Sequence, residues 1–415
     1  MRTRFLVAVA LALFFARAAA AAGFAISEQG AAATARGGAV TASPRDPSAL
    51  HYNPAGLAAL DGMQAYVGLD AVVPRAKYVG AAGGVSEPLA DNFYLPNLYA
   101  TYRLNELAAF GLALTTPFGL GIRWPESSPG HTLVREQQLR TTFITPAAAF
   151  DMSRWAPGLA VGVGLDLVPA SVYLERDIVF GSAAGNARLG GSAFGFGGRL
   201  GITYRPPAVR GLAAGLTYKS PVALDFSGKA DFDIDPVYRS QLPPDGDAST
   251  SLTLPQSLAL GVAYKPFGGL EVEVDGQWTG WSSYDELALT LPDGSETTSP
   301  KHWRDTFNVR VGAQYDLGPV ALRAGYTYDP TPVPRRTLDF SLPDANRHVL
   351  TAGAGITLPR DVQLDLAVAR VFNATRDTAW MPGTPTFKGR YEVRAWLVAA
   401  SVGVAFGKPA PAASL

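Results

Sequence analysis

Fourteen segments with alternating apolar and polar side chains constrain this chain more than any other feature of its sequence. Between Leu270 and Trp278, for example, Leu, Val and Trp alternate with Glu, Asp and Gln. Successive side chains of a strand point to opposite faces, so each segment predicts a strand with one apolar and one polar face. The fourteen segments lie near residues 62–76, 93–104, 107–116, 136–152, 157–176, 190–205, 210–229, 249–265, 268–283, 303–316, 319–329, 346–358, 361–374 and 389–406.

The connections between these segments alternate in length. Short ones, such as 265–268, 316–319 and 358–361, follow even-numbered segments, and long polar ones follow odd-numbered segments. An even strand count with short periplasmic turns and long outer loops is typical of outer-membrane barrels. Six of the seven segments that run towards the short turns end in an aromatic residue, as expected at a membrane interface: Tyr102, Phe150, Tyr204, Tyr264, Tyr315 and Phe406. We therefore predict an all-β protein, a 14-stranded antiparallel transmembrane β-barrel.

Composition and charge exclude several other classes of protein. The chain is 47% hydrophobic and 17% charged, yet after its first residues it has no apolar run of 18, so we expect no transmembrane helix. The 35 basic and 35 acidic side chains leave no net charge, so we expect no nucleic-acid partner. With no cysteine, a disulfide scaffold and thiolate chemistry are excluded.

The amino terminus predicts export. Arg2 and Arg4 precede an apolar run from Phe5 to Ala16, and small residues follow as far as Ala22. This order is typical of a secretory signal peptide over residues 1–22, and the apolar run is too short to span a bilayer. We expect cleavage after about residue 22 and a location in the outer membrane of a Gram-negative bacterium; an uncleaved membrane anchor is the alternative.

Residues 23–61 do not alternate and are rich in Ala, Gly, Asp and Pro. A barrel of this size has a lumen wide enough to need closing, so we interpret these residues as an internal hatch. A flexible periplasmic tail is the alternative. The predicted barrel occupies residues 62–406, and residues 407–415 form a short tail beyond the last aromatic.

Several motifs resemble one family. Gly23-Phe24 and Asn53-Pro54-Ala55 resemble the hatch of the FadL-type transporters. Further similarities follow in order at 116–125, 254–258, 278–282, 303–306, 322–326 and 342–344. The resemblance implies a plugged barrel that takes up long-chain fatty acids or aromatic hydrocarbons. In such a barrel the outer loops capture ligand, the interior holds it, and a hatch movement releases it sideways at a kinked third strand. The tail after Phe406 departs from the family, whose barrels usually finish on that aromatic.

Four apolar residues lie in a segment expected to protrude outside: Phe118, Leu120, Ile122 and Trp124. Because exposed apolar patches often mark binding sites, we predict a groove there through which substrate enters. Packing against a neighbouring loop or lipid is the alternative. In the third segment, Gly111 and the Thr115-Thr116-Pro117 end weaken strand pairing, which would permit a lateral opening.

Glu271, Glu273 and Asp275 point into the predicted lumen, as do Arg310 and Arg323 of the next two strands. Like charges in a row need cations, so we favour a charge ladder that braces the wall and hatch. The alternative is that Arg310 or Arg323 receives a substrate carboxylate.

No nucleophile–base pair and no metal-ligand spacing accompanies the four histidines, so we expect no catalytic residues, no metal and no cofactor. A nonspecific porin and an outer-membrane lipid hydrolase are the other candidate functions. The expected partners are hydrophobic small molecules, outer-membrane lipid and lipopolysaccharide, and we expect a monomer.

Overall fold

A computed structural model describes residues 23–180, 183–373, 375–379 and 387–406. The predicted signal peptide and the tail after Phe406 lie outside the described residues. Among the described residues, no helix is long and apolar enough to cross a membrane.

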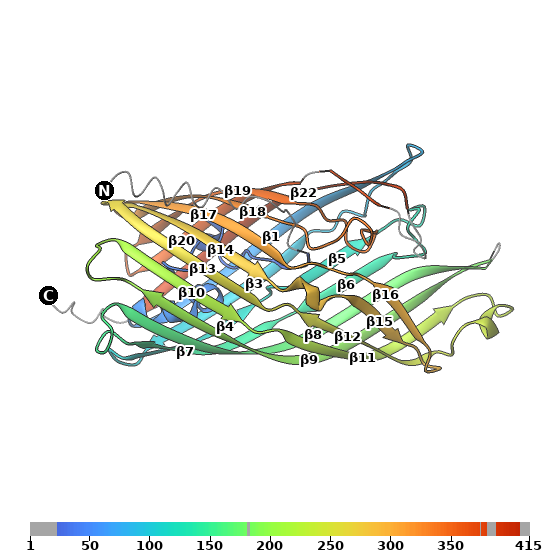
Figure 1. Ribbon diagram of the computed structural model, residues 1–415, viewed down its shortest axis with the longest axis horizontal. Helices are drawn as coiled ribbons and strands as arrows, with labels where there is room; N and C mark the ends of the chain where they lie inside the picture. Colours follow the sequence, from blue (N-terminus) through green and yellow to red (C-terminus); the bar gives the residue numbers. More distant parts are fainter. Residues whose placement is uncertain (1–22, 181–182, 374, 380–386, 407–415) are drawn as a thin grey trace.

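The described strands belong to one antiparallel sheet that closes on itself (Figure 1). β1 (Met63–Gly80) pairs with β22 (Gly389–Phe406) from Met63↔Phe406 to Gly80↔Gly389, which joins the two ends of the sheet. The remaining strands are β2 (Val85–Ser86), β3 (Phe93–Arg103), β4 (Ala108–Thr115), β5 (Gly119–Arg123), β6 (Glu136–Thr141), β7 (Phe143–Asp151), β8 (Leu159–Phe180), β9 (Ala183–Tyr204), β10 (Leu212–Lys219), β11 (Val222–Asp233), β12 (Gly246–Leu254), β13 (Ser257–Phe267), β14 (Leu270–Thr279), β15 (Glu286–Thr290), β16 (Glu296–Pro300), β17 (Thr306–Leu317), β18 (Val320–Asp329), β19 (Arg347–Leu358), β20 (Val362–Asn373) and β21 (Arg376–Asp377).

Over the described residues, the wall consists of fourteen successive strands, which we call staves. β6–β7, β10–β11 and β12–β13 each form one stave with an interruption. β2, β5, β15, β16 and β21 are short additions on the loop side. The predicted fourteen-strand antiparallel barrel is confirmed. Tight turns such as Gly318–Pro319 occupy one end, whereas long connections and the 22-residue strands β8 and β9 extend the other end.

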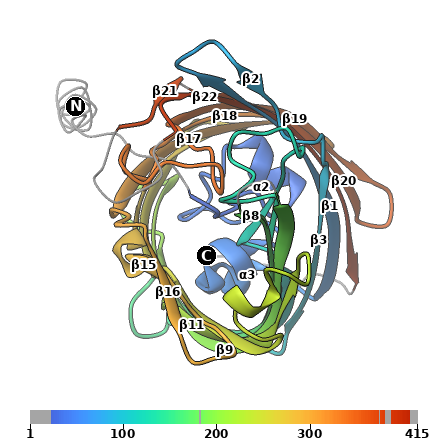
Figure 2. The same cartoon turned by 90° about the vertical axis from the view of Figure 1, so that its right-hand side faces the viewer.

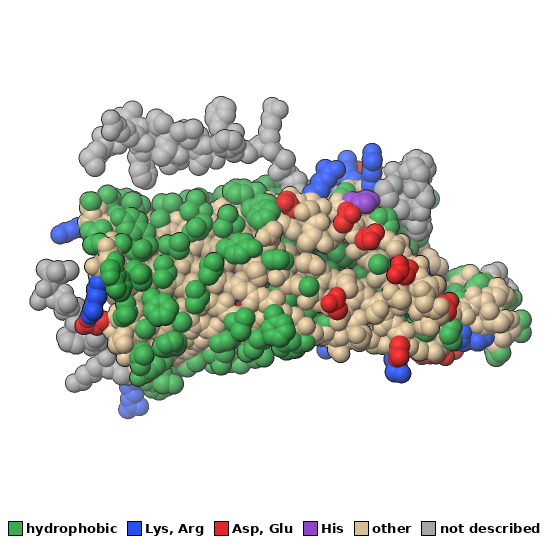
Figure 3. All heavy atoms as spheres, turned by 60° about the horizontal axis from the view of Figure 1, so that its bottom comes forward, with side chains coloured by type: hydrophobic (Ala, Val, Ile, Leu, Met, Phe, Trp, Pro, Cys, Tyr) green, Lys and Arg blue, Asp and Glu red, His purple; other side chains and the backbone are tan. Residues whose placement is uncertain are grey.

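The side chains alternate across the wall as the sequence predicted. On β1 the buried Tyr66 and Asp70 point inward, whereas Val67 and Leu69 are about half exposed on the outside. Figure 3 shows the result on one face, an apolar band with charged side chains gathered at its two ends. Exposed aromatics mark the turn-side border of the band, including Tyr102, Phe150, Tyr204, Tyr315 and Phe406. This distribution matches a lipid-facing surface.

The hatch lies inside the barrel, where α2 (Ala31–Ala35) and α3 (Ala49–Tyr52) are seen within the ring of strands (Figure 2). The 3₁₀ helix η1 (Pro54–Ala59) follows α3 and packs against β7, β8 and β9. Its close approach to the wall depends on glycines. A Cβ atom on Gly162 would lie 2.4 Å from the backbone nitrogen of Ala55, and one on Gly201 would lie 2.2 Å from Asn53 Oδ1. The small luminal residues therefore leave the space that the hatch fills.

The third stave is broken, and the break leaves part of β3 unpaired. β4 pairs with β3 only over residues 98–103 of β3. After Pro117 the chain continues as β5, which pairs with β6 rather than with β3. In the described part of the chain, residues Phe93–Asn97 therefore pair with β1 but have no strand on their other edge. The first hatch residues bind this bend, since Ile26 N donates to Pro117 O at 2.8 Å and Gly119 N donates to Phe24 O at 3.0 Å.

Candidate functional site

An aromatic cluster surrounds the start of the hatch. The Phe24 ring lies 4.8 Å from the Trp281 ring, 5.5 Å from Trp303 and 5.9 Å from Tyr284, measured between centroids. Gly23 precedes it with a φ of +58°, and a Cβ there would lie 2.6 Å from the Trp303 ring. Glycine is therefore required for the chain to insert Phe24 among these rings.

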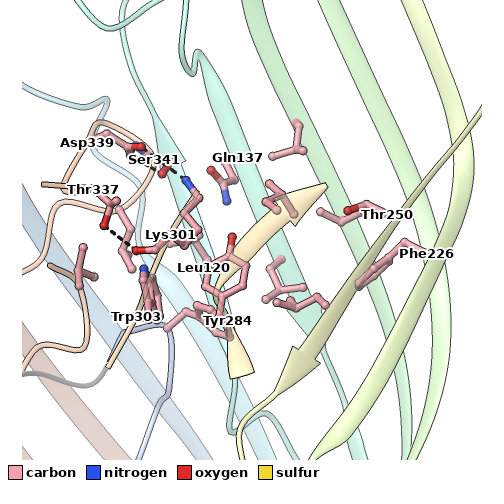
Figure 4. Close-up of a pocket in the computed structure, with 18 residues that line it drawn as sticks. Leu120, Gln137, Phe226, Thr250, Tyr284, Lys301, Trp303, Thr337, Asp339 and Ser341 are labelled. Carbon is pink, nitrogen blue, oxygen red and sulfur yellow. Dashed lines mark hydrogen bonds and ion pairs between the residues drawn. The ribbon is translucent and has the colours of Figure 1, made fainter. Parts of the chain in front are cut away.

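Next to this cluster lies a small cavity of about 50 Å³, which we call the inner pocket (Figure 4). Its wall is apolar apart from a few groups, of which Lys301 is the buried cation. Lys301 Nζ lies 3.5 Å from Asp339 Oδ2, and Thr337 donates to the backbone oxygen of Lys301 at 2.7 Å. Burial acts to lower the pKa of Lys301, but Asp339 and Tyr284 raise it above its usual value, so the ammonium stays charged. The pocket thus offers an apolar lining with one charged end, where Lys301 is paired with Asp339.

A larger cavity of about 820 Å³, the side chamber, lies beside the break in the third stave. Phe93–Pro96 of β3 line one side, and Thr116 and residues 118–123 line another. Phe24, Leu120, Leu139 and Leu342 belong to the walls of both the side chamber and the inner pocket. The two cavities are therefore separated by shared side chains rather than by a strand. A volume of several hundred Å³ with apolar walls is typical of sites for small ligands.

The segment predicted to form a groove contributes to these walls, but it does so from inside the molecule. Phe118, Leu120 and Ile122 are partly buried and line the side chamber. Trp124 is only 1% exposed, and its indole nitrogen donates to Phe340 O at 2.9 Å. Three of the four residues thus face a cavity, whereas Trp124 packs against a neighbouring loop, which was the alternative interpretation.

Gly111 lies below the break. It pairs with Thr101 on one side and Ala147 on the other, within the fully hydrogen-bonded part of β4. A Cβ at this position would lie 2.9 Å from the Leu50 side chain of the hatch. The structure therefore places Gly111 at a hatch contact and places the unpaired edge six residues later, beside Pro117.

The Asn53-Pro54-Ala55 motif attaches the hatch to the wall. Asn53 Nδ2 donates to Thr41 O at 2.7 Å and to Ile202 O at 3.0 Å, and its Oδ1 accepts from Ala55 N at 3.1 Å. Each polar atom of the side chain therefore has a partner in this buried position, as a buried amide requires.

The charge ladder also binds the hatch. Arg36 Nη2 lies 3.3 Å from Glu271 and 3.1 Å from Glu273, and Ala42 N donates to Glu273 at 2.6 Å. Asp275 accepts from Val40 N and Thr41 N at 3.1 and 3.0 Å. The cations of this acidic row thus come mainly from the hatch, with Lys265 of β13 3.5 Å from Glu271, rather than from Arg310 and Arg323.

The two wall arginines have other partners. Arg323 Nη1 contacts Asp365 Oδ1 at 2.6 Å with both side chains buried, and its Nε donates to Gln314. Arg310 lies opposite Asp275 in the strand register but donates to Gln277 at 3.0 Å, with no ion pair among the described residues. Arg310 lines a cavity of about 80 Å³ with Lys219 and Arg199.

Sequence reasoning did not single out Lys301 or Tyr284 as candidate site residues. Both lie in connections on the loop side, where no alternation or motif identifies a lining residue. The Trp278–Ser282 and Trp303–Thr306 motifs marked the right region, because Trp281 and Trp303 form the cluster around Phe24.

Comparison with known proteins agrees with this architecture. The family described as outer membrane protein transport protein (OMPP1/FadL/TodX) matches residues 12–406. A long-chain fatty acid transport protein from Escherichia coli K12 is 25% identical over 454 aligned positions, covering 97% of this chain and 98% of that protein. Outer membrane protein P1 of Haemophilus influenzae is 23% identical over 308 positions, with 66% of this chain and 65% of that protein covered.

Two solved structures share the fold. A Pseudomonas aeruginosa FadL homologue has a TM-score of 0.84 and 20% identity, covering 93% of this chain and all of that one. The Pseudomonas putida toluene transporter TodX has a TM-score of 0.76 and 20% identity, covering 92% and 99%. Since the family match extends over almost the whole chain, this protein belongs to the OMPP1/FadL/TodX family of outer-membrane transport proteins.

Proposed function

We propose that this protein is a passive channel for hydrophobic small molecules, such as long-chain fatty acids or aromatic hydrocarbons. The observation that carries the proposal is the pair of cavities with predominantly apolar walls, one of which adjoins the break in the barrel wall. The names of relatives support it, because those proteins are a fatty acid transport protein and a toluene transporter.

Movement of the hatch is the step that connects the two cavities. The inner pocket of about 50 Å³ is far smaller than the several hundred Å³ of an ordinary ligand site, so it must expand to hold one. Phe24 lines both cavities and is the first side chain of the hatch. A ligand that displaces Phe24 gains room and also pulls on the backbone hydrogen bonds between residues 24–26 and the bend at Pro117.

Release follows sideways through the break. Phe118, Leu120 and Ile122 form an apolar path towards the unpaired edge of β3, so an apolar molecule need not cross water. We place the opening beside Phe93–Asn97 and Pro117 rather than at Gly111. The outer-leaflet lipid and lipopolysaccharide surround the barrel, and the protein acts as a monomer because each barrel holds a complete pathway.

Fluorescence quenching with dibromostearate tests ligand binding at this site. Bromine quenches tryptophan on contact, and two of the seven tryptophans, Trp281 and Trp303, lie beside Phe24. We expect saturable quenching in the purified protein, competition by toluene, and loss of most quenching in the Trp281→Phe/Trp303→Phe variant. Trp155→Phe is the matched control, since Trp155 lies 66% exposed at the turn end. Equal quenching in the double variant would contradict the proposed site.

A nonspecific porin is the second candidate, and the buried hatch opposes it. The hatch lies within the lumen and hydrogen-bonds to the wall at Glu273, Ile202 and Arg199. A large open-pore conductance of the purified protein in a planar bilayer would favour the porin. The lipid hydrolase has no specific observation in its favour.

A further inference from the structure

Three arginines lie on the outer surface of the barrel at the loop-side edge of its apolar band. Arg75 of β1, Arg394 of β22 and Arg370 of β20 all fall on the outward phase of their strands, which are adjacent in the sheet. Met63 lies at the turn-side end of β1, and Arg75 is twelve residues further along the strand. At ~3.3 Å per residue and a tilt of roughly 40°, this places it about 30 Å higher, near the outer border of the hydrocarbon layer.

The strand register brings these side chains together. Arg75 lies directly opposite Arg394, and Arg394 lies opposite Phe372 on its other side. Arg370 lies opposite Trp396, two residues closer to the centre of the membrane along the strands. Its guanidinium carbon lies 4.7 Å from the Trp396 ring centroid and 5.3 Å from the Phe372 ring centroid. Directly opposed residues such as Arg75 and Arg394 have Cβ atoms about 5 Å apart, and diagonal neighbours such as Arg394 and Arg370 lie about 7–8 Å apart, so the three cations form one cluster.

The cluster has no anion of its own. Among the described residues no carboxylate lies within 4.0 Å of Arg75, Arg370 or Arg394, although most arginines of the lumen and loops have one. The positions that the structure does not describe contain no Asp or Glu. The acidic residue on this face of β22, Glu392, lies opposite Lys77 and makes no ion pair with any of the three arginines. Two like charges in directly opposed positions destabilise a sheet unless an anion lies between them.

Below the cluster the same three strands present only apolar side chains. Leu69 of β1, Val398 and Val402 of β22 and Leu366 and Val368 of β20 are all at least 40% exposed. They form a continuous wall, because Val398 lies opposite Val368 and Val402 lies opposite Val67. The surface therefore combines a cationic edge with an acyl-chain-sized apolar face directly beneath it.

We propose that this surface binds lipopolysaccharide of the outer leaflet through the phosphates of its lipid A. Arg75 and Arg394 clamp one phosphate, since a planar guanidinium offers paired donors that match phosphate oxygens. Arg370 holds the same headgroup from below, and the acyl chains lie along the apolar wall. This site is on the outside of the wall, and of its three arginines only Arg394 also belongs to the lining of the side chamber.

Native mass spectrometry of the detergent-solubilised protein tests the proposal, with diphosphoryl lipid A and fully dephosphorylated lipid A as probes. The wild type is expected to retain diphosphoryl lipid A and to bind the dephosphorylated form at least about tenfold more weakly. The R75Q/R370Q/R394Q variant is expected to lose that preference. Equal binding of both probes by the wild type would overturn the proposal whatever the variant does.

The control variant is R188Q/K229Q/R239Q, which also removes three cations from the loop side. Each of these has a carboxylate partner: Arg188 lies 3.6 Å from Glu175, Lys229 lies 3.6 Å from Asp247, and Arg239 lies 2.8 Å from Asp245. It should bind diphosphoryl lipid A as the wild type does, and heat-dependent electrophoretic mobility verifies that both variants are folded barrels. An equal loss of binding in the control would also overturn the proposal, because it would reduce the effect to net charge.

Discussion

At the residue scale, the contacts between hatch and wall depend on glycines, which allow close approach, and on charged side chains, which bind across the contact. Glu271, Glu273 and Asp275 were predicted to point inward, and they do. Their main partners were not predictable, because Arg36 and residues 40–42 lie more than 200 positions away and no periodicity relates the two segments. Alternation fixes which face a side chain is on, but only the tertiary fold decides what lies opposite it.

Glu273→Gln is expected to loosen the hatch while the barrel stays folded. The substitution leaves Arg36 without its 3.1 Å ion pair and weakens the hydrogen bond from Ala42 N, in a place where both side chains are buried. Leaving a buried charge unpaired typically costs about 3–5 kcal/mol, and the cost here is smaller because Arg36 keeps Glu271 at 3.3 Å. Amide hydrogen exchange of residues 39–45 should therefore accelerate strongly, and unchanged protection there would contradict this account of the ladder.

Gly162→Ala is expected to displace the Pro54-Ala55 turn. The new methyl carbon would lie 2.4 Å from backbone atoms of the hatch, so the hatch must move by about an ångström, which costs about 1–3 kcal/mol. Gly198→Ala is the matched control, since its added carbon meets nothing nearer than 3.7 Å. Urea denaturation followed by the fluorescence of Trp281 and Trp303, which contact Phe24 of the hatch, should separate the two variants, and identical midpoints would argue against close packing at Gly162.

At the element scale, the broken third stave is the feature that distinguishes this barrel from a sealed cylinder. Gly111 and Pro117 both weaken strand pairing in principle. The structure separates them, because Gly111 is paired with a strand on each side whereas the chain leaves β3 after Leu114. The sequence predicted a weak third strand but not the position of its break, since a proline lacks one donor and does not specify where the chain goes next.

Crosslinking across the break should block transport if molecules leave there. Asp91 and Arg123 face each other across it, with a 2.9 Å ion pair. Because the chain has no cysteine, an Asp91→Cys/Arg123→Cys variant can be joined cleanly by a short reversible thiol crosslinker. Uptake should fall at least about tenfold on crosslinking and return on reduction, since the gap is the proposed exit.

The control crosslink joins Lys229→Cys to Asp247→Cys, a pair that already lies 3.6 Å apart on two hydrogen-bonded strands. It should leave uptake unchanged with and without reductant. An equal effect of both crosslinks, or of neither, would remove the break from the transport pathway.

At the scale of the whole molecule, strand alternation was sufficient to predict the barrel because every stave faces lipid on its outer side. Each strand must present an apolar outer face, so the pattern repeats along the chain and can be counted. The aromatic cluster around Phe24 has no such repeat. Trp281, Tyr284 and Trp303 come from irregular connections, and their meeting with the hatch depends on how long loops fold over the barrel mouth.

The central claim is that the plugged barrel transports hydrophobic molecules, and whole-cell uptake tests it most directly. Cells that lack their own transporter would be given radiolabelled oleate or toluene, with this protein present or absent. We predict saturable, protein-dependent uptake of at least one of the two, because the cavities are apolar and limited in size. Uptake of neither compound, together with a large open-pore conductance, would contradict the account and favour a nonspecific porin.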